Sequence, residues 1–259
     1  YMTTSVTHRR QGAFSGMMNH IHDEARERGD IVSGLWASQA HLYSRFDYGL
    51  GVNSYDWEID PGFGSFSHSP ISDDDKSDAH VYFVDADEAA AMLPGIYEQM
   101  RQQIVASVDR NPGRWRYQLF DEERVRDGAS ALFFAICEED GEQTGYVAYR
   151  MRRKGDTDMG VMEIIEQVSV TDTAHATMWR FLLNFDLVGK ITATNRPADD
   201  PLWWMLADPR RLNRTSHDAL WVRLLDIPNA LESRTYNADG QIKIGLISES
   251  QPAEAGTYV

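Results

Sequence analysis

Four residues near the start of the chain, Arg9, Arg10, Gln11 and Gly12, are suited to holding a pyrophosphate group. They stand between a segment of strand character and a helical pattern, so the free N–H groups of the helix's first turn would point at a bound anion. The helix dipole favours negative charge there, glycine permits close approach, and two arginines add fork-shaped donors. We call residues 9–12 the basic turn. Taken alone it is only moderately specific, because solvated basic turns of this composition occur on many protein surfaces.

The other chemically interesting side chains favour structural roles. Cys137 is the only cysteine, which excludes an internal disulfide and a cysteine-based metal cluster. Its place at the end of an apolar run predicts a packed thiol. His20 and Glu24 share a helix face but offer only two metal ligands, and His22 faces another direction. No G-x-S-x-G sequence of a serine hydrolase occurs. We therefore expect neither a metal site nor a hydrolase triad.

The segments around the basic turn follow one another at the spacing of an α/β protein. Apolar residues recur every three or four positions from residue 14 to residue 25, which predicts an amphipathic helix closed by Gly29. The predicted elements, in order, are a strand end at 1–4, this helix to about residue 28, a buried strand at 31–37, a short helix at 39–46 and a strand at 52–59.

A second α/β unit is predicted beyond residues 61–78. That segment is rich in Gly, Ser, Pro and Asp and has no periodicity, so we expect a linker without a packed element. The elements predicted after it are a strand at 80–84, a long helix at 88–108, a hairpin of strands at 131–137 and 144–151, a helix at 178–185 and a strand at 220–225.

A near-repeat connects the two halves. Residues 5–8, of sequence Ser-Val-Thr-His, resemble residues 169–172, of sequence Ser-Val-Thr-Asp, at an offset of 164. At this offset the basic turn corresponds to Thr173, Ala174, His175 and Ala176, which include neither glycine nor arginine. Chance similarity of so short a string stays open, but the shared strand-turn-helix context favours a duplication whose second copy has lost the anion site.

Composition restricts the partners. The 259 residues are 42% hydrophobic and carry a formal charge of -15, which disfavours a nucleic-acid surface and favours solubility or cationic ligands such as polyamines and aminoglycosides. The apolar runs are too short for a membrane span, and no secretion signal is visible. We therefore expect a cytoplasmic protein that contacts neither nucleic acid nor membrane.

Residues 8–14 and 36–49 closely resemble the Eis family of GNAT acetyltransferases, which modify aminoglycosides and, in some members, lysine. The resemblance continues through residues 178–183 and 220–228 and so covers most of the chain. It implies a GNAT domain, a second GNAT-like domain without cofactor, a sterol-carrier-like C-terminal domain and a hexamer. The implied segments are the C-terminal half of the first GNAT domain at 1–60, a linker at 61–79, the degenerate GNAT-like domain at 80–215 and the beginning of the sterol-carrier-like domain at 216–259.

The resemblance also implies the roles of individual residues. Tyr43 would be the general acid that protonates the departing thiolate; the alternative is an aromatic side chain packed beside Phe46. Acetyl-CoA would be the co-substrate, and no metal would be involved. The implied acetyl-CoA residues are Met2, Thr3, Thr4, Arg9, Arg10, Gln11, Gly12, Ala13, Phe14, Ser15, Ser38 and Gln39.

We interpret the parent protein as an acetyl-CoA-dependent N-acetyltransferase acting on aminoglycoside-like, polyamine or lysine amines. The alternatives are a non-catalytic acyl-CoA or lipid-binding protein and a GNAT-like scaffold for oligomer assembly. Relatives begin with early strands and helices that are missing before Tyr1, so we expect a fragment with little or no activity of its own. In the family the terminal carboxylate is taken as the base, a role that we do not assign to Val259.

Overall fold

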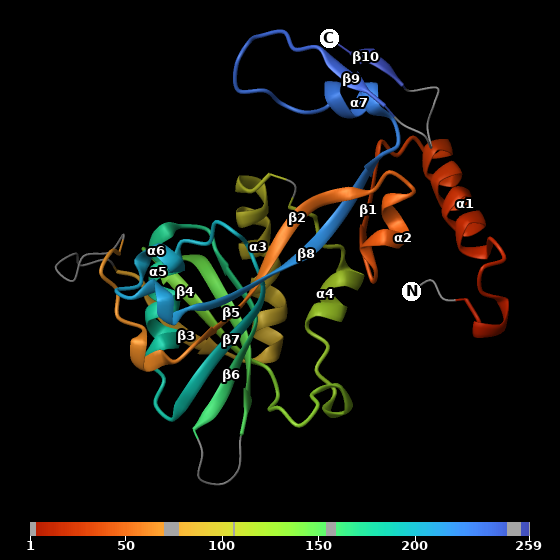
Figure 1. Ribbon diagram of the computed structural model, residues 1–259. Coiled ribbons are helices and arrows are strands. Elements are labelled where there is room, and N and C mark those ends of the chain that lie inside the picture. The colour runs from red at the N-terminus through yellow and green to blue at the C-terminus, as the bar shows by residue number, and fades with distance from the viewer. Residues whose placement is uncertain (1–3, 70–77, 106, 154–158, 248–254, 259) are drawn as a thin grey trace. The chain divides into compact units, whose positions relative to one another are not determined.

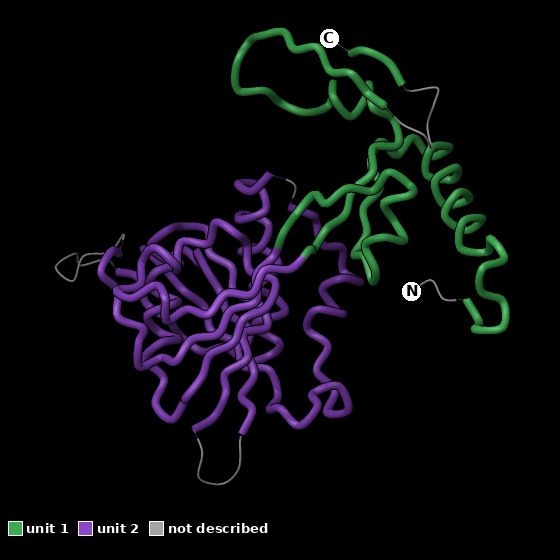
Figure 2. Tube along the Cα trace, viewed as in Figure 1, with its two compact units in different colours: residues 1–53, 218–259 green, residues 54–217 purple. Residues whose placement is uncertain are grey.

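The chain forms two units and passes between them within strands β2 (Gly49–Ile59) and β8 (Asn213–Leu224). Unit 1 consists of residues 1–53 and 218–259, and unit 2 of residues 54–217 (Figure 2). The structure is a computed structural model that describes residues 4–69, 78–105, 107–153, 159–247 and 255–258. The predicted strand end at 1–4 therefore lies, apart from Thr4, outside the described residues.

Unit 1 has the helices and strands predicted around the basic turn, but the expectation of a buried strand at 31–37 is wrong, because Val32 and Trp36 are exposed. Its core consists of the buried Met18, Tyr43, Phe46 and Tyr48, with Phe14 and Leu35 among the residues packed against them. Gly29, with a φ of 82°, follows the end of the first helix as predicted. The elements are η1 (Val6–His8), α1 (Ala13–Glu27), β1 (Val32–Trp36), α2 (Ala40–Ser44), the first residues of β2, the last residues of β8, α7 (Ile227–Glu232), β9 (Ile244–Leu246) and β10 (Gly256–Tyr258).

The end of β8 belongs with β1. The two strands are antiparallel, from Val32 opposite Leu224 to Trp36 opposite Leu220. Strand β2 also lies against β8, because a Cβ added to Gly51 would be 2.8 Å from a methyl group of Val222. The predicted strand at 220–225 is therefore present, but our assignment of it to the beginning of a third domain is wrong: it completes a sheet with the strands that follow the basic turn. The sterol-carrier-like domain stays a prediction.

Unit 2 is a mixed sheet with helices on both faces (Figure 1). The order of its strands is β2-β7-β6-β5-β4-β3, and only β6 and β7 among these described pairs are parallel. The elements are η2 (Pro61–Phe63), β3 (His80–Val84), α3 (Ala86–Gln103), α4 (Pro112–Gln118), η3 (Glu123–Val125), β4 (Phe133–Glu139), β5 (Glu142–Arg152), β6 (Gly160–Ser169), α5 (Asp172–Leu183), β7 (Val188–Arg196), α6 (Leu202–Met205) and η4 (Pro209–Arg211).

Alternation along the central strands gives this sheet two cores. In β4, Ala135 and Cys137 face the cluster that contains α5, whereas Phe134 and Ile136 face the cluster that contains α3. Cys137 is fully buried, and burial raises the pKa of its thiol to about 12. Both the burial and the raised pKa support the prediction of a packed, unreactive cysteine.

In the residues that the structure describes, no helix is long and apolar enough to cross a membrane.

Three predicted segments differ from the structure. The helix predicted at 178–185 is α5, which begins six residues earlier, at Asp172, and ends at Leu183. Helix α3 begins at a capping box formed by Asp85 and Glu88 and ends at Gln103, not at residue 108. Ile104 is already extended, and the Tyr97 hydroxyl donates to the carbonyl of Val108, which turns the chain back along the helix. The described part of the predicted linker, residues 61–69, contains η2 and packs through Phe66, which bridges to Leu206; the expectation of no packed element there is wrong. Apart from the placement of the strand at 220–225, the domain boundaries stay a prediction.

Candidate functional site

The basic turn leaves the first turn of α1 open. Arg10 and Gly12 have φ angles of 62° and 82°, so the chain enters the helix through two left-handed residues, which only glycine adopts without strain. Gly12 is the N-cap of α1, and no side chain accepts a hydrogen bond from the N–H groups there. A Cβ added to Gly12 would meet nothing within 4 Å. The backbone donors at this helix end are therefore accessible to an anion.

The region of these donors carries positive charge. Arg9 and Arg10 are exposed, and neither forms an ion pair with another residue in the described part of the chain. Arg45, which the sequence analysis did not select, lies with its guanidinium 5.4 Å from the ring centroid of Phe14 and 4.9 Å from that of Phe46. Its place in the α2 segment, two residues after Tyr43, is the only sequence signal that could have identified it. Three guanidinium groups thus belong to this region without a carboxylate partner among the described residues.

Tyr43 lies beside the first turn of α1. Its ring packs edge-on against Phe14, with 5.7 Å between ring centroids, and against Tyr48 at 6.2 Å. The side chain is buried, and its hydroxyl forms no hydrogen bond with any residue that the structure describes. Two predicted site residues, Tyr43 and Phe14, are therefore in contact although 29 positions separate them. The same packing is also expected if Tyr43 is only a packed aromatic side chain of the core.

The remaining predicted acetyl-CoA residues are less informative. Ser38 and Gln39 are exposed in the connection between β1 and α2, and Gln39 is the N-cap of α2 without a side-chain hydrogen bond. Thr4 is partly buried, and Ser15 is in the first turn of α1. Met2 and Thr3 lie outside the described residues. The roles of these residues in acetyl-CoA binding, like the catalytic role of Tyr43, stay predictions.

Sequence reasoning missed a buried polar network in unit 1. His22, on the inner face of α1, bonds through Nε2 to the Tyr48 hydroxyl at 3.0 Å, and that hydroxyl also bonds to Ser33 at 2.6 Å. On its other side, His22 Nδ1 lies 2.8 Å from a guanidinium nitrogen of Arg223 in β8. Burial and then the charge of Arg223 lower the pKa of His22 to about 4. The imidazole is therefore neutral near pH 7 and links α1 to the strands.

The second copy of the near-repeat enters its helix differently. Thr171 is the N-cap of α5 and accepts a hydrogen bond from the Ala174 N–H at 2.9 Å, while its hydroxyl donates to Glu139. We call residues 170 and 171 the capped turn. The offset of 164 fails beyond it: α5 begins at Asp172, the counterpart of His8, whereas α1 begins five residues later. Ala174 and Ala176, the counterparts of Arg10 and Gly12, are fully buried within the helix.

Next to the capped turn, strands β6 and β7 stop pairing, and the side chain of Arg196 lies between them. The pairing of β6 with β7 ends at Ile164 and Ala193, although both strands continue. Arg196 bridges the strands beyond that point, donating to the backbone and side-chain oxygens of Gln167 at 3.1 and 2.7 Å. Asp200 pairs with Arg196 and lies 3.2 Å from His175 Nε2. Burial opposes its charge, but these partners hold the pKa of Asp200 well below the usual range.

Comparisons with known proteins agree with this arrangement. Two family models, both described as an acetyltransferase (GNAT) domain, match residues 1–51 and 106–224. The first match contains the basic turn, β1 and α2, and the second contains most of unit 2. The α/β class and the presence of two GNAT-type regions are thereby confirmed.

Longer relatives match nearly the whole of this chain. An uncharacterized N-acetyltransferase of Streptomyces avermitilis is 34% identical over 239 residues, which are 92% of this chain and 58% of the relative. N-acetyltransferase Eis of Mycobacterium tuberculosis is 32% identical over 238 residues, 91% of this chain and 56% of that protein. The crystal structure of Eis1 from Mycobacterium abscessus superimposes with a TM-score of 0.81 at 28% identity, covering 99% of this chain and 63% of that one.

The chain thus spans somewhat more than half the length of the relatives that it matches. Both GNAT matches, the identity to Eis over more than nine tenths of the chain and the shared fold point to one family. The chain belongs to the Eis family of GNAT N-acetyltransferases.

Proposed function

We propose that the parent protein transfers the acetyl group of acetyl-CoA to an amine, and that unit 1 holds the co-substrate. The exposed backbone donors of the basic turn, with Arg9 and Arg10 beside them, would bind the pyrophosphate. Arg45 would add a third positive charge. Thr4, Ser38 and Gln39 would complete the site together with Met2 and Thr3. The residues present fit a polyanion, because the donors of this turn are exposed and lack partners in the described structure.

The observation that carries the catalytic part is the contact of Tyr43 with Phe14. It places a phenol with an unused hydroxyl next to the first turn of α1. In direct transfer, the neutral amine forms a bond to the thioester carbonyl, the bond from carbon to sulfur breaks, and the sulfur takes a proton. Tyr43 would supply that proton, and backbone N–H groups at the end of β1 would stabilise the oxyanion.

The acceptor belongs to the proposal as well. A formal charge of -15 favours a cationic amine, such as an aminoglycoside, a polyamine or a lysine side chain. We expect the parent to be a homo-oligomer, a hexamer by family resemblance, with a sterol-carrier-like domain as its C-terminal part. Unit 2 would bind no acetyl-CoA, since the capped turn lacks the arginines and the glycine of the basic turn and Thr171 already accepts the Ala174 N–H.

Substitution of Tyr43 by Phe in the full-length protein tests the catalytic role. If the hydroxyl protonates sulfur, kcat should fall about 10² to 10⁴-fold while the Kd for acetyl-CoA changes less than about twofold. Tyr48→Phe is the matched control, because it removes a hydroxyl from the same aromatic cluster, but one already bonded to His22 and Ser33. It should lower the free energy of unfolding by about 1 kcal/mol and leave kcat nearly unchanged.

A Tyr43→Phe enzyme that keeps more than about a third of wild-type kcat, with chemistry limiting the rate, would make Tyr43 a packing residue. The rival function, a non-catalytic acyl-CoA or lipid-binding protein, is separated by a thiol assay. An acetyltransferase releases free thiol from acetyl-CoA when a polyamine is added, whereas a binding protein takes up the same ligand without release.

A further inference from the structure

Unit 2 contains a pocket of about 1040 Å³ between α3, α4 and the segment that leads into β4. Small-molecule sites in proteins reach roughly 1,000 Å³ and are lined mainly by apolar and aromatic side chains with a few placed polar groups. This pocket has that character, and it is separate from the basic turn because all its residues belong to unit 2. The apolar lining includes Pro94, Trp115, Leu119, Phe120, Leu132 and Phe134.

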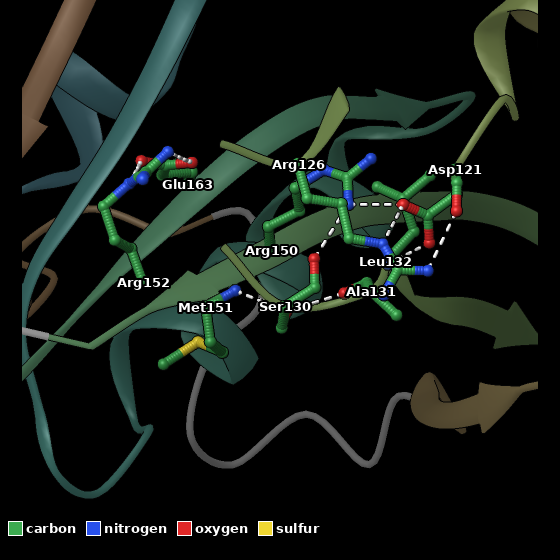
Figure 3. A network of polar contacts seen from close by, with 9 residues as sticks. All are labelled: Asp121, Arg126, Ser130, Ala131, Leu132, Arg150, Met151, Arg152 and Glu163. Atoms are coloured by element: carbon green, nitrogen blue, oxygen red, sulfur yellow. Dashed lines mark hydrogen bonds and ion pairs between the residues drawn. The ribbon is translucent and has the colours of Figure 1, made fainter. Parts of the chain in front are cut away.

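One wall of the pocket is held in place by a carboxylate. Asp121 accepts the backbone N–H of Leu132 at 2.8 Å and pairs with Arg126 and with Arg150 of β5, as Figure 3 shows. Arg150 also donates to the carbonyl of Ser130 at 2.8 Å, within the same network. These contacts fasten the loop between α4 and β4 to the sheet. The wall that carries Leu119, Phe120 and Leu132 is therefore formed before any ligand arrives.

A second ion pair holds another part of the lining in place. Arg110 donates through both terminal nitrogens to Glu166 of β6, and Glu166 also accepts the Tyr146 hydroxyl at 2.8 Å. The guanidinium of Arg110 lies 3.8 Å from the ring centroid of Tyr97 and 4.9 Å from that of Trp115, so it also positions α4 against α3. Because these contacts exist within the protein itself, we expect a ligand to bind with little loss of freedom in the lining residues.

Most charged groups of the lining are already paired. Glu98 accepts from Arg101 and Gln102, Asp121 is held as described, and Glu122 accepts from Arg124. Two donors differ. Neither the Arg116 guanidinium nor the Trp115 indole N–H has a hydrogen-bond partner among the described residues. The two polar side chains of the lining without a hydrogen-bond partner among the described residues are therefore both donors, and Arg116 carries a full positive charge.

We propose that this pocket binds an organic carboxylate with an apolar body. The apolar walls would cover the body, and the carboxylate would accept from Arg116, whose planar fork matches two carboxylate oxygens. An ammonium head group on the same body would repel the Arg116 guanidinium, and a hydroxyl would offer one uncharged acceptor in place of two charged carboxylate oxygens. The site is independent of the acetyl-CoA site, so either proposal can fail without the other.

Calorimetry on the 259-residue chain with three ten-carbon probes tests the proposal. Decanoate, decanol and decylamine share one apolar body and differ in the head group. We expect decanoate to bind about tenfold more tightly than the other two, a ratio at the lower end for charge-assisted hydrogen bonds because Arg116 is exposed. Arg116→Gln should remove this preference. Arg114→Gln removes the same charge from the same helix at a residue that stacks on Tyr117 and does not line the pocket, so it should keep the preference.

A third variant locates the binding. Ala90, an exposed residue of α3, lines the pocket, so Ala90→Trp should fill it and weaken decanoate binding at least tenfold without changing Tm. Absence of decanoate binding, equal affinity for decanoate and decanol, or equal losses in Arg116→Gln and Arg114→Gln would each overturn the proposal. So would full binding by a correctly folded Ala90→Trp chain.

Discussion

The basic turn and the capped turn begin with nearly the same residues and treat the N–H groups of the next helix in opposite ways. At α1, two left-handed residues, one of them Gly12, leave the donors exposed beside two arginines that have no carboxylate partner in the described part of the chain. At α5, Thr171 takes the Ala174 N–H, and Glu139 adds negative charge nearby. A strand-turn-helix unit is therefore not enough for a phosphate site: the donors must be left unused, and the local charge must be positive.

The largest expected effect comes from adding negative charge to the open turn. Asp tolerates a left-handed φ better than most residues, so Gly12→Asp should fold, but its carboxylate would lie beside phosphate oxygens. We expect the Kd for acetyl-CoA, measured by calorimetry on the full-length protein, to rise about 100-fold or more. Gly16→Asp, with the same charge one helical turn further on, should cost less than about fivefold.

The same titration examines the capped turn. The wild-type protein should bind one acetyl-CoA per chain, because the second copy lacks the glycine and both arginines. Two equivalent sites would break the comparison, and so would a Gly12→Asp protein of unchanged affinity.

The two helices that follow these turns should contribute differently to the pH dependence of stability. Each buries a histidine, but His22 of α1 faces Arg223, with Arg26 and Asp23 on its own helix, whereas His175 of α5 faces Asp200. The pKa of His22 is lowered from 6.5 to about 4, so its contribution to stability is complete above pH 6.5 and is lost as the pH falls toward 4. Between pH 7.5 and 5 that loss is about 2 kcal/mol of unfolding free energy.

Urea titrations at several pH values would measure this loss. His22→Gln should flatten the pH dependence by that amount, since glutamine keeps a hydrogen-bonding group but does not titrate in this range. Nuclear magnetic resonance gives the pKa directly, and a value near 6.5 for His22 in the folded chain would contradict its burial beside Arg223.

Two threonines at equivalent positions of the near-repeat offer a smaller and closely matched test. Thr171→Ala removes a helix N-cap and should lower the free energy of unfolding by about 1 kcal/mol. Among the described residues, the Thr7 hydroxyl bonds to the exposed Ser5 and His8 alone, so Thr7→Ala should change the free energy of unfolding by less than about 0.5 kcal/mol. If both variants lose the same free energy of unfolding in chemical denaturation, Thr7 must stabilise its turn through a contact that differs from those described.

The smallest expected effects are changes in stability of opposite sign at two glycines near the start of α1. Gly12→Ala forces a methyl group onto a left-handed residue and should destabilise the chain by about 1 kcal/mol. Gly16→Ala, inside α1 with open space around it, should stabilise the chain by about 0.5 to 1 kcal/mol. A shift of Tm in the same direction for both would show that the left-handed conformation of Gly12 is unimportant.

Local patterns made the neighbourhood of the basic turn predictable. The apolar period of α1, the glycine that closes it and the alternation of the strands all lie within short windows. The Arg196 bridge to Gln167, the contact of His22 with Arg223 and the pocket behind α4 could not be predicted this way. Each joins residues far apart in the sequence, and the pairing partner of a buried charge leaves no periodic trace. For the same reason, the antiparallel pairing of β8 with β1 leaves no signal within residues 220–225 themselves.

The burial of Cys137 makes the chain convenient for site-specific labelling. A thiol that reacts only as thiolate, with a pKa of about 12 and no exposed surface, should ignore maleimide reagents while the fold is intact. Because it is the only cysteine, a cysteine introduced at an exposed position such as Gln11 would be the single reactive group, with no need to delete the native one. A fluorophore attached there would sit in the basic turn and report the arrival of a phosphate-bearing ligand through a change in its emission.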